Sequence, residues 1–101
     1  MRQARVAVYR VAPGRFEEVV EKARTGMLPV FQRHRGFEAY AIIRGGQGGE
    51  DQAISVSEWA SRRDAEEAVD SAAAWVAANL ADALELVQEY VGDIAFSTRD
   101  A

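Results

Sequence analysis

Residues 55–61 read SVSEWAS, and this stretch decides the fold because a strand ends and a helix begins inside it. Small polar and apolar residues alternate up to Trp59, as they do in a half-buried strand. Ser61 then provides a strong helix N-cap. Trp59 shares a strand face with Ser55 and Ser57. Depending on where that face looks, Trp59 is a core residue, a wall of a ligand pocket or part of an interface between subunits.

The elements on either side of this junction follow from their periodicity. The run of good helix formers after Ser61 spaces its apolar residues as one buried helix face, and we expect this helix to end near Asn79–Asp82. Earlier in the chain, Pro13-Gly14 precedes another helical pattern, which ends or kinks near Gly26–Leu28, with a further turn starting at Pro29. The predicted strands lie at residues 4–11, 36–44, 53–59 and 88–97, the last with a bulge or close approach at Gly92.

The predicted element order is therefore β-α-β-β-α-β. This is the ferredoxin-like α+β unit, a four-stranded antiparallel sheet with two helices on one face. Strict alternation in the second strand places Phe37 and Tyr40 on opposite faces. Both faces of the strands carry apolar residues, whereas a solvated face would be polar. Because so short a chain has little else to cover the second face, we expect a homodimer that packs sheet against sheet into an α+β barrel.

Composition disfavours several classes of function. The 101 residues suit one domain, 1–101, and a net charge of −4 argues against a nucleic-acid partner. The chain has no cysteine and one histidine, so we expect no disulfide and no metal site. No stretch approaches the ~20 apolar residues of a membrane span, and the first residues lack the apolar segment of a signal peptide. We therefore predict a cytoplasmic protein without a membrane partner.

Three features together resemble the dimeric α+β barrel superfamily: the element order, the junction RHRGFEAY at 33–40 and the junction SVSEWAS. Over about residues 4–97 the chain looks most like the antibiotic biosynthesis monooxygenase domain. The resemblance implies that ligands bind between sheet and helices, and that oxygenation proceeds without a cofactor. The haem-degrading branch is disfavoured because its tryptophan and its haem-ligating histidine would fall at Ala68 and Ala78.

Other motifs do not indicate a catalytic or phosphate site. The glycines of GGQGGE at 45–50 lie between two predicted strands, whereas a phosphate loop needs a following helix and usually a lysine, so we expect a hairpin loop. Paired carboxylates such as Glu17 and Glu18 lie at solvated helix positions. No Ser-His-Asp triad is indicated, because His34 has no partners at a suitable spacing.

The predicted site is the space between the sheet and the helices, where apolar walls and a few polar atoms suit a small aromatic ligand. Alanines of the second helix face this space and leave either close contact or a void. We expect substrate-binding residues at Tyr9, Phe31, Tyr40, Trp59 and Trp75, and catalytic residues at His34, Arg44 and Asn79.

Each of these residues also has a purely structural interpretation. The aromatic residues can be core, Tyr9 and Tyr40 can lie at the dimer interface, and Arg44 can pair with Glu58 across neighbouring strands. Two functions therefore stay open. One is a cofactor-independent monooxygenase of an aromatic or polyketide-like molecule, in which the deprotonated substrate gives an electron to O₂. The other is a non-catalytic dimeric module that binds a small ligand or a partner.

Overall fold

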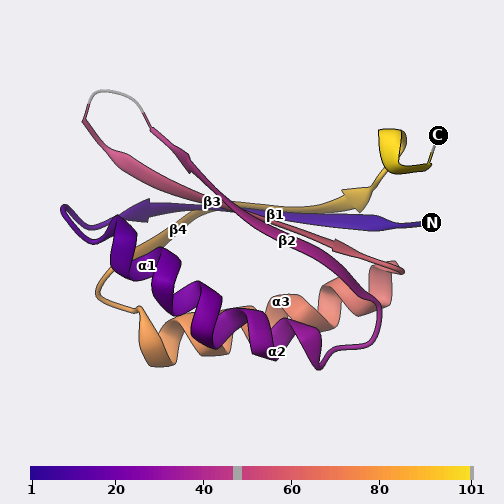
Figure 1. Cartoon of the computed structure of the whole chain (residues 1–101), viewed down its shortest axis with the longest axis horizontal. Coiled ribbons are helices and arrows are strands. Elements are labelled where there is room, and N and C mark those ends of the chain that lie inside the picture. Colours follow the sequence, from indigo (N-terminus) through magenta and orange to yellow (C-terminus); the bar gives the residue numbers. More distant parts are fainter. Residues whose placement is uncertain (47–48, 101) are drawn as a thin grey trace.

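The computed structural model describes residues 1–46 and 49–100, so part of the predicted hairpin loop, Gln47 and Gly48, lies outside the described residues. The elements follow in the order β1 (Gln3–Val11), α1 (Phe16–Lys22), η1 (Ala23–Met27), α2 (Leu28–Gln32), β2 (Phe37–Gly45), β3 (Asp51–Trp59), α3 (Arg62–Asn79), β4 (Leu84–Asp93) and η2 (Thr98–Asp100). The four strands form one antiparallel sheet in the order β2-β3-β1-β4. Figure 1 shows α1, α2 and α3 on one face of it, with most of the other face open. The ferredoxin-like α+β prediction is confirmed.

The helices on this face form two layers side by side, the continuous run of α1, η1 and α2 and the separate helix α3. Local features of the sequence determine where each layer begins. Ser61 caps α3 as predicted, because its hydroxyl accepts a hydrogen bond from the backbone N–H of Asp64 at 3.1 Å. The first helical layer continues from Phe16 to Gln32, and its middle turn, η1, is π-helical. The predicted irregularity near Gly26–Leu28 is thus a change in winding, and Pro29 lies in the first turn of α2, as predicted. In the described part of the chain, no helix combines the length and apolar character needed to cross a membrane.

Gly26 lets the π-helical turn lie directly against α3. A β-carbon added at Gly26 would lie 2.5 Å from Cζ2 of Trp75 and 3.0 Å from its Nε1. Such a distance is shorter than van der Waals contact allows, so the indole would have to move. The glycine therefore fixes how closely the two helical layers approach.

Gly26→Ala is expected to lower the free energy of unfolding by about 1–3 kcal/mol, the usual cost of overpacking. Alanine is the better helix former by about 1 kcal/mol, so a loss of stability isolates the contact with Trp75. Urea unfolding measures the difference. The control is Arg24→Ala in the same turn, whose side chain is 67% exposed. A Gly26→Ala protein as stable as this control would contradict the prediction.

The strand faces show where the aromatic residues point. Tyr9 on β1 and Trp59 on β3 are 8% and 0% exposed and face the helices. On β2 the register shifts between Phe37 and Ala39, so that Phe37 pairs with Trp59 and Tyr40 pairs with Ser57. Phe37 and Tyr40 therefore share the helix-covered face. The prediction of strict alternation was wrong here, because a bulge adds a residue and turns the following side chains over.

The last strand lies earlier than predicted, at Leu84–Asp93 instead of 88–97. Residues 84–87 contain good helix formers, but pairing with β1 overrides that local preference. The register shift falls at Val87, because Gln88 pairs with Val8 and Leu86 pairs with Tyr9. Gly92 instead occupies a regular position where an added β-carbon would meet nothing within 4 Å, so the prediction of a bulge or close approach there was wrong.

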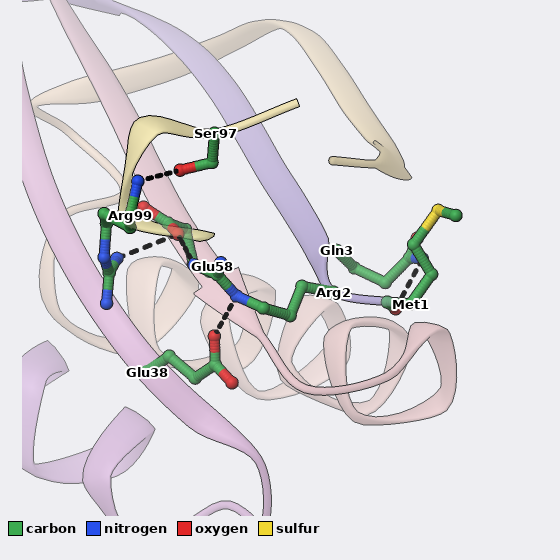
Figure 2. Close-up of polar contacts among 7 residues, drawn as sticks. All are labelled: Met1, Arg2, Gln3, Glu38, Glu58, Ser97 and Arg99. Atoms are coloured by element: carbon green, nitrogen blue, oxygen red, sulfur yellow. Dashed lines mark hydrogen bonds and ion pairs between the residues drawn. The ribbon is translucent and has the colours of Figure 1, made fainter. Parts of the chain in front are cut away.

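The C-terminal segment returns to the sheet by hydrogen bonds and ion pairs. The backbone N–H of Ile94 donates to the carbonyl oxygen of Arg2 at 2.9 Å. Figure 2 shows Glu58 between two cations, with Arg99 at 2.9 Å and Arg2 at 2.6 Å, while Arg2 also contacts Glu38 at 2.7 Å. Glu58 lies on the strand face opposite Trp59. The tail is thus attached to one end of the sheet face that the helices leave open.

Candidate functional site

A small cavity lies between the sheet and the two helical layers. Its volume is about 30 Å³, room for a water molecule or two and far less than an aromatic ring needs. The walls are mostly apolar and come from all four strands and both layers. The lining residues are Arg5, Tyr9, Val19, Ala23, Met27, Phe31, Tyr40, Ile42, Ala53, Ser55, Ala72, Trp75, Val76, Leu80 and Leu84.

Arg5 is the unusual member of this lining, because it is a charged side chain only 2% exposed. Its Nε and Nη2 donate to Oε2 of Glu89 at 3.0 and 2.6 Å. Nη2 also lies 3.4 Å from the hydroxyl of Tyr9. A buried guanidinium needs such a partner, since burial of an unpaired charge is very costly. The cavity lining thus includes a cation and a phenol, and a carboxylate outside the lining pairs with the cation.

Tyr40 and Ser55 add two hydroxyls to the same lining. Burial raises the pKa of Tyr40 to about 12, because the phenolate loses its hydration. A hydrogen bond with Ser55 and the charge of Arg5 act in the opposite direction and limit the rise, while Tyr9 adds to it. Tyr40 is therefore a neutral hydrogen-bonding group at ordinary pH.

The raised pKa of Tyr40 predicts a loss of stability at high pH. In the unfolded chain a tyrosine loses its proton near pH 10, whereas folded Tyr40 keeps it to about pH 12. The contribution to stability is therefore complete below pH 10 and is lost as pH rises through 12. A difference titration of phenolate absorbance between the unaltered protein and Tyr40→Phe is expected to show a midpoint near pH 12. A midpoint near the unfolded value would contradict this prediction.

Two grooves flank the cavity, one on each side of the helical layers. The groove between α3 and β4 has a volume of about 330 Å³ and shares Arg5, Tyr9, Val76 and Leu84 with the cavity lining. The groove between the first helical layer and β2 has about 280 Å³ and shares Ala23, Tyr40 and Ile42. A ligand in either groove can therefore touch residues of the cavity.

The alanines of α3 produce both outcomes that the sequence left open. Ala65, Ala68 and Ala72 are at most 1% exposed and pack closely in the core. Ala73 and Ala77, on the side toward β4, line the larger groove. One face of α3 thus gives close packing, and its neighbouring face leaves space.

The five residues expected to bind substrate all lie on the helix-covered side of the sheet. Tyr9, Phe31, Tyr40 and Trp75 line the cavity. Trp59 lies behind Phe31, with ring centroids 5.3 Å apart, and its indole N–H donates to Oγ of Ser57 at 2.9 Å. Trp59 is therefore a core residue that supports the wall, and a place at a sheet-to-sheet interface is excluded for it.

The three residues expected to be catalytic line neither the cavity nor the two grooves. His34 lies near α3, with Nε2 2.8 Å from Oγ of Ser71. Arg44 is exposed, pairs with Asp51 and lies over the ring of Phe16. Asn79 ends α3 and donates its amide to the carbonyl oxygen of Trp75 at 2.9 Å. Their catalytic role stays a prediction, and the structure does not bring them together.

Three site residues were missed at the level of sequence: Arg5, Ser55 and Glu89. The alternation of β1 could have identified Arg5, because it lies two residues before Ala7 and four before Tyr9, on the buried face of the strand. A charge on a buried face points to a partner elsewhere. The partner, Glu89, depends on the register of β4, which local periodicity did not give.

Comparisons with known proteins agree with this fold. The family model described as antibiotic biosynthesis monooxygenase matches residues 3–80. SnoaB, a cofactor-independent oxygenase from Streptomyces nogalater, is 16% identical, with a TM-score of 0.69 and 96% of each chain covered. Rv0793 from Mycobacterium tuberculosis is 17% identical, with a TM-score of 0.71, covering 97% of this chain and 99% of that one. Among curated proteins, no sequence matches this chain.

Proposed function

We propose that this chain, which belongs to the antibiotic biosynthesis monooxygenase family, is a cofactor-independent monooxygenase of an aromatic or polyketide-like small molecule. The observation that carries this proposal is the polar set in the apolar lining. The guanidinium of Arg5 and the hydroxyls of Tyr9, Tyr40 and Ser55 all line one cavity. Apolar walls with a few polar groups are typical of sites that bind and orient a small molecule.

The chemistry requires little beyond binding, orientation and stabilisation of charge. An acidic phenol or enol loses a proton, and the resulting anion transfers an electron to O₂. A site that fixes the substrate beside O₂ removes much of the entropic barrier. Hydrogen-bond donors already fixed around the developing anion stabilise it more than water does. Arg5 and the hydroxyl of Tyr9, which line both the cavity and the groove between α3 and β4, are such donors.

Oxygen consumption tests this function. The protein is mixed with a panel of dihydroxyanthracene-like compounds, and uptake of O₂ is followed together with the appearance of the oxygenated product. We expect turnover with at least one member, and a rise in the melting temperature with each compound that binds. No turnover and no thermal shift with any aromatic compound would refute the proposal.

A second function is supported by the small size of the cavity. About 30 Å³ does not admit an aromatic ring, so the interior is closely packed in this conformation. Under this alternative the chain is a non-catalytic module that binds a small ligand in a surface groove or a partner on its open face. Thermal shifts without oxygen uptake would favour this alternative.

We further propose that two copies pack through the open sheet face. Apolar side chains occupy its middle, with Val6 and Val56 paired across β1 and β3, and Ile43 49% exposed on β2. Monomeric proteins rarely expose large contiguous apolar surfaces. A two-fold contact is self-complementary and would remove this surface from water.

Val56→Glu is expected to convert the dimer to a monomer without unfolding the chain. Near a two-fold axis the substitution brings two unpaired negative charges into one apolar contact, while in the single chain Val56 is partly exposed. Light scattering at micromolar concentration measures the mass. Ala74→Glu, which adds the same charge to an exposed position of α3, is the control and should stay dimeric. A monomeric mass for the unaltered protein would contradict the dimer.

A further inference from the structure

The ion pair between Arg5 and Glu89 is arranged unevenly. Both contacts from Arg5 go to Oε2 of Glu89, at 3.0 and 2.6 Å. Oε1 accepts no hydrogen bond from any residue that the structure describes. A carboxylate has lone pairs on both oxygens, so Oε1 keeps its full capacity to accept a proton or a hydrogen bond.

Glu89 faces the groove between α3 and β4, and it is the sole carboxylate among the described residues of that lining. Its side chain is 26% exposed, whereas Arg5 behind it is 2% exposed. Apart from Arg5 and the hydroxyl of Tyr9, the remaining walls are apolar. The groove thus combines an apolar surface with a partly exposed carboxylate, one oxygen of which is bound by Arg5.

We propose that Glu89 is the catalytic proton acceptor of the oxygenation reaction, that Arg5 positions it, and that the substrate, a planar phenol or enol, lies in the groove between α3 and β4. This inference rests on the proposed function and adds its general base. The guanidinium of Arg5 is buried and cannot move freely. Its ion pair with Glu89 therefore holds the carboxylate in one orientation. General bases act within hydrogen-bond reach of the proton that they remove.

The step balances with O₂ as the co-reactant. The substrate O–H bond breaks, its proton bonds to Oε1 of Glu89, and the electron pair stays on the substrate. The anion gives one electron to O₂, and the two radicals join in a C–O bond. The peroxide takes the proton held by Glu89. The C–H bond of the same carbon then breaks and its electron pair forms the carbonyl as the O–O bond breaks, and the released hydroxide combines with this second proton to leave as water. The substrate loses two hydrogens and gains one oxygen atom.

The first part of the test separates proton transfer from binding. Glu89→Gln keeps an oxygen for Arg5 but cannot accept the proton. Its kcat for oxygen uptake is expected to fall about 100-fold, within the range for removal of a general base. Its Kd for 1,8-dihydroxyanthraquinone, a phenol that does not consume O₂, is expected to change less than about threefold, because the groove is preserved. The control is Glu85→Gln on the same strand, an exposed residue paired with Arg10.

The second part locates the substrate by closing the groove. Ala77 lines the groove, and its neighbour Ala78 is exposed and does not line it. Ala77→Phe is expected to weaken binding of the anthraquinone more than about tenfold, since the new ring fills the groove. Ala78→Phe adds the same ring outside it and is expected to bind as the unaltered protein does.

The outcomes are decisive in each direction. A fall in kcat of tenfold or more for Glu89→Gln, together with separation of the two alanine variants, supports the proposal. Turnover by the unaltered protein with a smaller fall, or equal binding by the two variants, overturns this inference and leaves the proposed function intact. No turnover by the unaltered protein overturns both. If circular dichroism shows that Glu89→Gln does not fold, Glu89→Asp takes its place. Aspartate is one methylene shorter and withdraws the carboxylate from the substrate, so its kcat must also fall at least tenfold. A smaller fall would overturn the inference.

Discussion

Replacing Trp59 with alanine is expected to lower the free energy of unfolding by about 3–5 kcal/mol, the range for truncation of a large buried aromatic residue. Trp59 is 0% exposed and makes edge-to-face contacts with Phe31 and Phe37, with ring centroids 5.3 and 5.4 Å apart. Its indole N–H donates to Oγ of Ser57, so the polar atom of the side chain also has its partner inside the fold. Domains have about 5–15 kcal/mol in total, so this loss removes much of the stability.

Urea unfolding followed by circular dichroism gives the midpoint and slope for this variant. Phe96→Ala serves as the control, because Phe96 is an aromatic residue that is 80% exposed, and its loss should cost less than about 0.5 kcal/mol. Trp59→Phe is expected to fall between the two, since it keeps a ring but leaves Ser57 without its donor. Equal stability of the Trp59→Ala and Phe96→Ala proteins would show that the core does not depend on Trp59.

The element order followed from the sequence because each boundary carries a local signal. Ser61 caps a helix through its own hydroxyl, and Pro29 starts a turn through its fixed φ angle. Two of the errors in the strands have the opposite cause. The bulge after Phe37 and the early start of β4 at Leu84 depend on pairing with distant strands. Nothing within a few residues of either position specifies that pairing.

Fewer of the site residues could be predicted from the sequence, because some of them are brought together only by pairing between distant strands. An aromatic residue on a strand or helix has a face that periodicity predicts, and four of the five predicted residues line the cavity. A pair such as Arg5 and Glu89 joins residues 84 positions apart, and it forms only when β1 and β4 are in register. The chemistry of His34 and Arg44 makes them candidates, but the fold gives each another partner, Ser71 on α3 for His34 and Asp51 on the neighbouring strand for Arg44.

Replacing Glu89 with leucine is expected to lower the free energy of unfolding about as much as a typical core truncation, because it leaves the guanidinium of Arg5 buried without a carboxylate. Removal of one partner from a buried pair typically costs about 3–5 kcal/mol. The partial exposure of Glu89 lets water approach, so the lower end of that range is expected. Urea unfolding of Glu89→Leu checks the size of the effect, and a loss below about 1 kcal/mol would contradict it.

The double variant Arg5→Met with Glu89→Leu separates stability from function. With both charges removed, neither is left unpaired, and apolar replacements of buried pairs are often neutral or stabilising. We therefore expect the double variant to regain most of the loss in a double-mutant cycle, yet to lose oxygen uptake with every compound that the unaltered protein oxidises. A double variant as unstable as Glu89→Leu would show that the fold needs the ion pair. A stable and active double variant would show that the pair takes no part in the reaction. A stable, inactive one would mean that the buried charge is retained for chemistry, because the fold does not need it.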